Sequence, residues 1–202
     1  VTKLLKQQAL NSTLKKFSKK YSEVWDIVVY GSAARGKEDA RDLDFALILS
    51  KKSDESKKLA LAQEVKAEIE DVFPSVQIDV KSVVIDDFFD ENFLARQGII
   101  AEGYLRLRKE SLAKKLGFGT FALIKYSLQG LTSSQKKMLY YALKGRRDSK
   151  GVLTQIGGKL ISREVLKVPI EFSFKIEELL SMHQVKFTTE FMMIYRKRGG
   201  GF

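Results

Sequence analysis

Three aspartates and a Gly-Ser pair are the residues of this 202-residue chain whose types and spacing could do chemistry. Asp42 and Asp44 stand two positions apart and lead into an apolar run at residues 45–49, so on a strand their carboxylates would point to the same side. Like charges held this close raise one another's pKa unless a cation lies between them. The pair therefore predicts a site for a divalent cation.

The Gly-Ser pair follows an apolar run at residues 28–30, which reads as a buried strand. A glycine at the end of a strand lets the backbone approach a ligand closely. A helix beginning at Ser32 would in addition direct free N–H groups at that ligand. Gly31 and Ser32 thus predict a site for an anion such as a triphosphate.

The order of these residues resembles the signature of the nucleotidyltransferase superfamily, which includes DNA polymerase beta, the CCA-adding enzymes and the minimal nucleotidyltransferases. In this chain an apolar residue and Gly31-Ser32 are followed by a spacer, residues 33–41, and then by Asp42-Leu43-Asp44. The superfamily has a third carboxylate on a later strand, and Asp79, between Ile78 and Val80, matches it. The resemblance covers about residues 26–105.

The resemblance implies a two-metal mechanism of phosphoryl transfer. Asp42 and Asp44 would bridge both Mg²⁺ ions, for which Mn²⁺ is a substitute, and Asp79 would hold the ion next to the attacking hydroxyl. The chain has no cysteine and one histidine, which argues against a zinc site and leaves carboxylate ligands with a hard cation.

The resemblance also implies a binding site for an NTP, with ATP as the first candidate. Gly31 and Ser32 would hold the β- and γ-phosphates through backbone N–H groups, and the serine hydroxyl would add a donor. Arg35 would reach the γ-phosphate. The alternative for Arg35 is a salt bridge to Glu38 or Asp39.

Positive charge is concentrated in the C-terminal part of the chain. Residues 1–110 hold 19 basic and 19 acidic residues, whereas residues 111–202 hold 17 basic and 6 acidic ones, a net charge of +11. A basic module beside a neutral one indicates a polyanionic partner, although lysine-rich surfaces also simply keep proteins in solution. Nucleic acid, with RNA favoured, is the predicted partner, and the densest basic cluster is formed by Lys144, Arg146, Arg147 and Lys150.

The apolar periodicity predicts an α/β domain at residues 1–108, with a mixed sheet flanked by helices. Residues 86–98 read as one of these helices. Residues 109–202 predict a small basic α+β module, in which residues 158–169 form a hairpin or a long strand and residues 196–202 a disordered tail. The chain has no apolar stretch of membrane-spanning length and no apolar signal core, so we expect a cytoplasmic protein.

The sequence therefore favours an enzyme that transfers a nucleoside monophosphate from an NTP to an acceptor hydroxyl. The acceptor would be RNA, a protein or a small molecule. The alternative is a non-catalytic, antitoxin-like protein of the same fold that binds a protein partner. Asp79 favours the enzyme, because many short relatives of the antitoxin type lack a clear third carboxylate.

Overall fold

The computed structural model describes residues 8–147 and 149–195, and the chain divides into two compact units, Val1–Gly117 and Phe118–Phe202. The expected boundary after residue 108 lies inside the first unit. Residues beyond it still belong to that unit because a short strand, β5 (Glu110–Ser111), pairs with β4 (Tyr104–Leu105). The tail expected at residues 196–202 lies outside the described residues.

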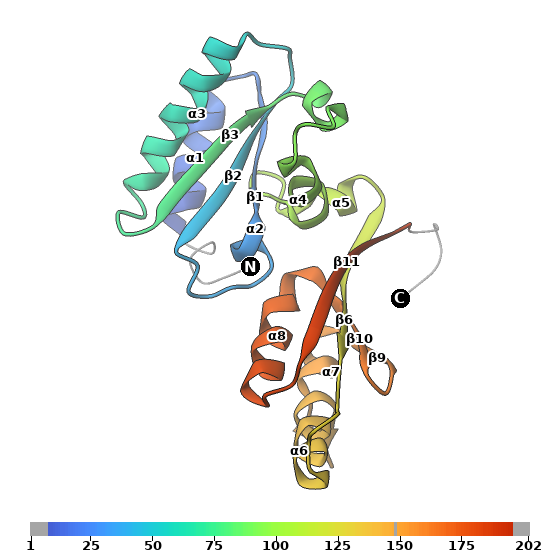
Figure 1. The fold of residues 1–202 in the computed structure, drawn as a ribbon. Helices are drawn as coiled ribbons and strands as arrows, with labels where there is room; N and C mark the ends of the chain where they lie inside the picture. Colours follow the sequence, from blue (N-terminus) through green and yellow to red (C-terminus); the bar gives the residue numbers. More distant parts are fainter. Residues whose placement is uncertain (1–7, 148, 196–202) are drawn as a thin grey trace. The chain divides into compact units, whose positions relative to one another are not determined.

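The first unit is built on a mixed sheet of five strands in the order β3-β2-β1-β4-β5 (Figure 1). Its three long strands are β1 (Val24–Tyr30), β2 (Asp42–Leu49) and β3 (Gln77–Val83). β2 pairs with β3 in parallel, and the other pairs are antiparallel. The predicted α/β architecture is confirmed. The parallel pairing matters for function because it sets Asp44 beside Asp79.

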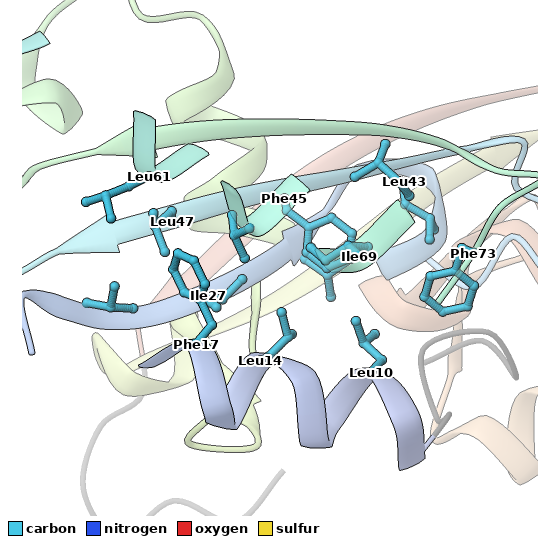
Figure 2. Close-up of a cluster of buried hydrophobic side chains, with 14 of the residues drawn as sticks. Leu10, Leu14, Phe17, Ile27, Leu43, Phe45, Leu47, Leu61, Ile69 and Phe73 are labelled. Atoms are coloured by element: carbon cyan, nitrogen blue, oxygen red, sulfur yellow. The ribbon is translucent and has the colours of Figure 1, made fainter. Parts of the chain in front are cut away.

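Two helices, α1 (Gln8–Lys20) and α3 (Glu55–Glu70), cover one face of this sheet (Figure 1). Each presents a helical stripe of apolar side chains to the strands, and Figure 2 shows Leu10, Leu14 and Phe17 of α1 directed at the sheet. The strand side of this core is supplied by alternate residues such as Phe45 and Leu47, both buried. This packing anchors β1 and β2, whose ends carry the predicted site.

The other face is covered by α4 (Ala95–Glu102), which packs Ile99 against the sheet. The single helix predicted at residues 86–98 is wrong. A short 3-10 turn, η2 (Ile85–Phe89), is followed by an irregular stretch before α4 begins. The reason is local: Asp87 accepts a hydrogen bond from the Val84 amide at 2.8 Å and Asp90 accepts one from the Asn92 amide at 2.9 Å, and such bonds compete with a continuous helix.

The second unit is a four-stranded antiparallel sheet in the order β11-β6-β10-β9 with helices packed on its apolar side. Residues 158–169 adopt the hairpin alternative, as β9 and β10 are antiparallel. A second small hairpin, β7–β8, follows α6. The strands are β6 (Phe118–Tyr126), β7 (Gly145–Arg146), β8 (Ser149–Lys150), β9 (Lys159–Ser162), β10 (Val165–Pro169) and β11 (Phe187–Tyr195), and the helices are α6 (Ser133–Lys144), α7 (Val152–Ile156) and α8 (Ser173–Met182).

Across the described residues, we find no helix with both the length and the apolar character needed to cross a membrane.

Candidate nucleotide and metal site

The site begins where β1 ends. The backbone turns at Gly31 with φ +74°, a conformation that side chains other than glycine rarely adopt, and enters the short helix α2 (Gly31–Ala34). A Cβ atom on Gly31 would lie 2.3 Å from Oδ2 of Asp44. Glycine is thus needed twice here, for the backbone conformation and for the close approach of the carboxylate. The predicted strand, glycine and helix start are all present.

The paired aspartates lie at the start of β2. Asp42 is exposed and Asp44 is half-buried. Asp44 pairs in register with Tyr30 of the antiparallel neighbour β1 and with Asp79 of the parallel neighbour β3. The structure therefore brings the three predicted carboxylates to one end of two neighbouring strands, together with the Gly31 turn.

Electrostatic repulsion among these carboxylates affects the pKa of Asp44. Its pKa is raised, first by burial and then by the negative charges of Asp42 and Asp79. The pKa of Tyr30 is also raised, mainly by burial and further by Asp44 and Asp79, so its hydroxyl stays protonated at neutral pH. A cation among these oxygens would remove the repulsion, and hard oxygen ligands suit Mg²⁺. The chemistry of the donor set fits a divalent cation.

Asp79 has a competing partner. Nζ of Lys81, two residues along the same strand, lies 2.6 Å from Oδ2 of Asp79, and both side chains are about half-exposed. Within the described ranges, no three acidic or histidine side chains are arranged so that they could hold a metal ion. Asp79 would have to turn from Lys81 to join the aspartates of β2 at a cation.

Ser32 has a buried hydroxyl, and its Oγ atom has no hydrogen-bond partner among the residues the structure describes. Leaving such a group unsatisfied costs about 1–3 kcal/mol, so a native protein usually has a use for it. Ser32 is also one of the first residues of α2, where backbone N–H groups lack partners within the helix. A phosphate oxygen would satisfy both kinds of donor.

Arg35 is held by a residue that the sequence reasoning did not assign. Its guanidinium donates to Oε1 of Glu102 at 2.7 Å, and the Glu102 side chain is only 8% exposed. Glu102 also contributes to the raised pKa of both Asp44 and Tyr30, so it lies in the same electrostatic neighbourhood. The sequence predicted that Arg35 contacts a phosphate or forms a salt bridge to Glu38 or Asp39, and it did not predict the pair with Glu102.

The signal for Glu102 was present in the sequence as Glu102-Gly103 ahead of β4. A Cβ atom at Gly103 would lie 2.1 Å from the Ile99 carbonyl oxygen and 2.7 Å from Cγ1 of Val28. Only a glycine therefore lets the end of α4 come this close to β1. That close approach is what delivers the Glu102 carboxylate to the site.

The predicted basic cluster lies in the second unit, separate from this site in the chain. Lys144 ends α6, and the β7–β8 hairpin carries Arg146, Arg147 and Lys150. All four side chains are exposed, and the Arg146 guanidinium lies 5.4 Å from the centre of the Tyr141 ring. The structure gathers the cluster at one hairpin, as expected, without indicating what it binds.

Residues 12–102 match the family model described as polymerase beta, nucleotidyltransferase. The matched segment contains the Gly31-Ser32 turn and all three aspartates. The match lies wholly within the first unit and agrees with the nucleotidyltransferase resemblance that the sequence motif carries.

Solved structures of toxin–antitoxin complexes overlap part of this chain. The MntA–HepT toxin–antitoxin structure is 16% identical, with a TM-score of 0.33, and the match covers 50% of this chain and 71% of that one. A tri-AMPylated Shewanella oneidensis HEPN toxin in complex with MNT antitoxin gives 16% identity, a TM-score of 0.33 and coverages of 49% and 70%. A toxin–antitoxin structure with AMP-PNP is 16% identical, with a TM-score of 0.35, and the match covers 48% of this chain and 71% of that one. No curated protein sequence matches the chain.

Proposed function

We propose that the first unit transfers a nucleoside monophosphate from an NTP, with ATP as the first candidate, to an acceptor hydroxyl. One observation supports this more than any other: Asp44, which is paired in register with Asp79, lies against a glycine turn whose Ser32 hydroxyl is buried and has no hydrogen-bond partner among the described residues. Carboxylates suit a cation and the turn suits a phosphate, and nucleotidyl transfer needs both side by side.

In the proposed reaction, the acceptor oxygen attacks the α-phosphorus, the bond from that phosphorus to the bridging oxygen breaks, and pyrophosphate leaves with the bond electrons. Asp42, Asp44 and Asp79 are the residues that would hold Mg²⁺ or Mn²⁺. A cation bound there would lower the pKa of the attacking hydroxyl and stabilise the charge on pyrophosphate. The hydroxyl proton passes to solvent or to a neighbouring carboxylate.

The remaining groups bind and orient the triphosphate. Gly31 and Ser32 donate backbone N–H groups to the β- and γ-phosphates, and the Ser32 hydroxyl adds a further donor. Arg35 supplies positive charge beside them, and its bond to Glu102 holds the guanidinium near the turn until the nucleotide arrives. The protonated Tyr30 hydroxyl can donate but cannot act as a base at neutral pH.

RNA is the acceptor that we favour, because basic residues exceed acidic ones by 15 to 6 in residues 118–202. Proteins and small molecules remain alternative acceptors. The deciding experiment incubates the full chain with Mg²⁺ and each α-labelled NTP in turn, together with separated pools of cellular RNA, protein and metabolites. Label in the RNA pool is expected. Label confined to another pool would replace RNA as the acceptor, and label in none would contradict transfer.

A non-catalytic reading is supported by a specific contact, the ion pair between Asp79 and Lys81, since a lysine neutralises the third carboxylate. In that case the domain would bind a nucleotide or a protein partner without turnover, in the manner of an antitoxin-like relative. Calorimetric titration of ATP with and without Mg²⁺ separates the two readings. Metal-dependent binding supports the enzyme, whereas binding that is absent or indifferent to metal supports the alternative.

A further inference from the structure

The second unit contains a cavity of about 380 Å³ that is separate from the aspartate site and opens at the edge of this unit's apolar core. α6, the end of β6, β9 and the β9–β10 turn contribute its lining, so it lies wholly within this unit. Its volume falls in the range of small-molecule sites. The apolar part of the lining consists of Leu128, Leu139, Leu143 and Leu160.

Positive charge surrounds this apolar lining. The cavity is also lined by Lys136, Lys137, Lys144 and Arg163 and, within the part of the chain that the structure describes, by no acidic residue. None of these four cations has a carboxylate within salt-bridge distance among residues 8–147 and 149–195. The nearby Glu164 is occupied, because its carboxylate accepts the Leu128 amide at 2.8 Å. An apolar site lined by four cations is complementary to a ligand that is anionic and also has a flat or apolar part.

Tyrosine rings supply the surface for the flat part of such a ligand. Tyr126, Tyr140 and Tyr141 all line the cavity. Tyr140 is 53% exposed, so its ring is accessible to a ligand. Tyr141 already lies 5.9 Å from Nζ of Lys137, which shows how ring and cation are combined here.

We propose that this cavity binds a nucleobase together with its phosphate, as presented by single-stranded RNA. The base would lie against Tyr140 and the leucines, and the phosphate would meet Lys136, Lys144 or Arg163. Base stacking on aromatic rings combined with backbone cations is the usual mode of single-strand binding. The proposal deepens the RNA-acceptor hypothesis and rests on it for its biological meaning, although the binding itself can be measured without any transfer.

The basic cluster at the β7–β8 hairpin favours a strand over a free nucleotide. Lys144 belongs both to the cavity lining and to this cluster, which continues into Arg146, Arg147 and Lys150. Phosphates adjoining the bound base would therefore find further cations. A free nucleotide would occupy the cavity alone and leave the hairpin unused.

The test is fluorescence anisotropy with the full chain, without NTP or divalent metal, and a labelled oligoadenylate about eight nucleotides long. Tyr140→Ala is expected to weaken binding about fivefold or more through lost stacking, and Lys136→Glu by about tenfold. Tyr195→Ala and Lys175→Glu are matched controls: Tyr195 is an exposed tyrosine of the same unit, and Lys175 lies in the first turn of α8 as Lys136 lies in the first turn of α6. Neither control residue lines the cavity, so both are expected to bind like the wild type.

Three further ligands identify what is recognised. An abasic strand of the same length and a duplex of the same sequence should bind at least fivefold more weakly, since neither can place a base on Tyr140. Free AMP should compete only weakly, because it lacks the adjoining phosphates. The proposal would be overturned in favour of a diffuse basic surface if the abasic strand bound as tightly as the oligoadenylate, or if the Lys136 and Lys175 variants lost the same affinity. Tight binding of AMP alone would mean that the ligand is a free nucleotide and not a strand.

The outcome can be separated from that of the proposed enzymatic function. Asp44→Asn should leave oligoadenylate binding unchanged, because Asp44 does not line this cavity. Specific binding without any transfer activity would leave the cavity assignment standing and contradict nucleotidyl transfer. Transfer of label with no base-dependent binding would support nucleotidyl transfer and contradict the cavity assignment.

Discussion

Asp42 and Asp44 are the residues on which the proposed chemistry most depends. Replacing either with asparagine keeps the shape but removes the charge that would hold a cation, so Asp42→Asn and Asp44→Asn should each abolish transfer. The fold should survive, and Asp44→Asn should raise the free energy of unfolding in metal-free buffer, because ionised Asp44 is disfavoured in the folded state by burial and by its neighbours. Product formation and chemical denaturation measure the two effects, and transfer retained in both variants would contradict the metal assignment.

Asp79 has a different expected role, next to the attacking hydroxyl. Asp79→Ala should eliminate transfer yet leave the affinity for Mg-ATP within about tenfold, which corresponds to about 1.4 kcal/mol. Lys81→Met is the informative companion, since it removes the group that pairs with Asp79 at 2.6 Å and should leave transfer intact or faster. A parallel loss of ATP binding and turnover in Asp79→Ala would mean that this carboxylate serves the nucleotide instead.

Gly31 offers a test that does not need an activity. Gly31→Ala should lower the free energy of unfolding by about 3 kcal/mol, because it combines the cost of a positive φ with overlap of the new Cβ and the Asp44 carboxylate at 2.3 Å. Gly117→Ala isolates the first contribution, since Gly117 has φ +90° but open space around it, and should cost about 1 kcal/mol. Equal effects of the two substitutions in urea denaturation would show that Asp44 moves away freely.

At the scale of elements, the site depends on the packing of α2 against α4. The ion pair between Arg35 and Glu102 joins these two helices across 67 residues of sequence, with side chains 23% and 8% exposed. Breaking a pair of this kind leaves a charge with little solvent, which costs more than the pair itself contributes.

Glu102→Gln should therefore lower the free energy of unfolding by about 2–3 kcal/mol and weaken ATP binding, since it removes the negative charge that holds the Arg35 guanidinium near the turn. The double variant Arg35→Met/Glu102→Gln should recover part of the stability but none of the ATP affinity. A double-mutant cycle in urea, run beside ATP titrations, separates the two contributions. Additive stability losses would indicate that the two side chains do not interact in solution.

At the scale of the whole molecule, the chain joins a nearly neutral unit, which carries the candidate site, to a basic one. Residues 118–202 hold 15 basic and 6 acidic residues, whereas residues 1–117 hold 21 and 19. From this asymmetry we expect different partners for the two units, a nucleotide for the first and a polyanion for the second.

Reversal of the basic cluster tests this division. Lys144→Glu/Arg146→Glu/Arg147→Glu should weaken RNA binding strongly and flatten its salt dependence, because each lost phosphate contact removes about 0.7–0.9 from the slope of log affinity against log salt. Mg-ATP binding by the first unit should not change. Filter binding of tRNA, duplex RNA and single-stranded DNA across a salt series measures the effect, and weak, salt-independent binding of all three would remove nucleic acid as the partner.

The residues of the candidate site could be picked out from the sequence because they are residue types at short spacing. Gly31-Ser32, the Asp42-x-Asp44 pair and the apolar frame around Asp79 each lie within a single strand or turn, where periodicity and glycine preferences are local properties. The mixed sheet and most helices of the first unit followed for the same reason. The prediction of a helix at residues 86–98 was wrong because side chains such as Asp87 accept hydrogen bonds from backbone amides, and such bonds compete with those of a helix. The apolar residues of this segment follow a helical spacing only moderately well.

Tertiary structure alone decided which distant residues meet. The pairing of Arg35 with Glu102 and the cavity that gathers Lys136, Tyr140 and Arg163 depend on how elements pack after they form. A short sequence pattern carries no information on such contacts, because register and packing are selected by the burial of whole apolar faces. The residue types therefore determined which chemistry could be proposed for the chain, and the packing of its elements determined where its charges and rings come together.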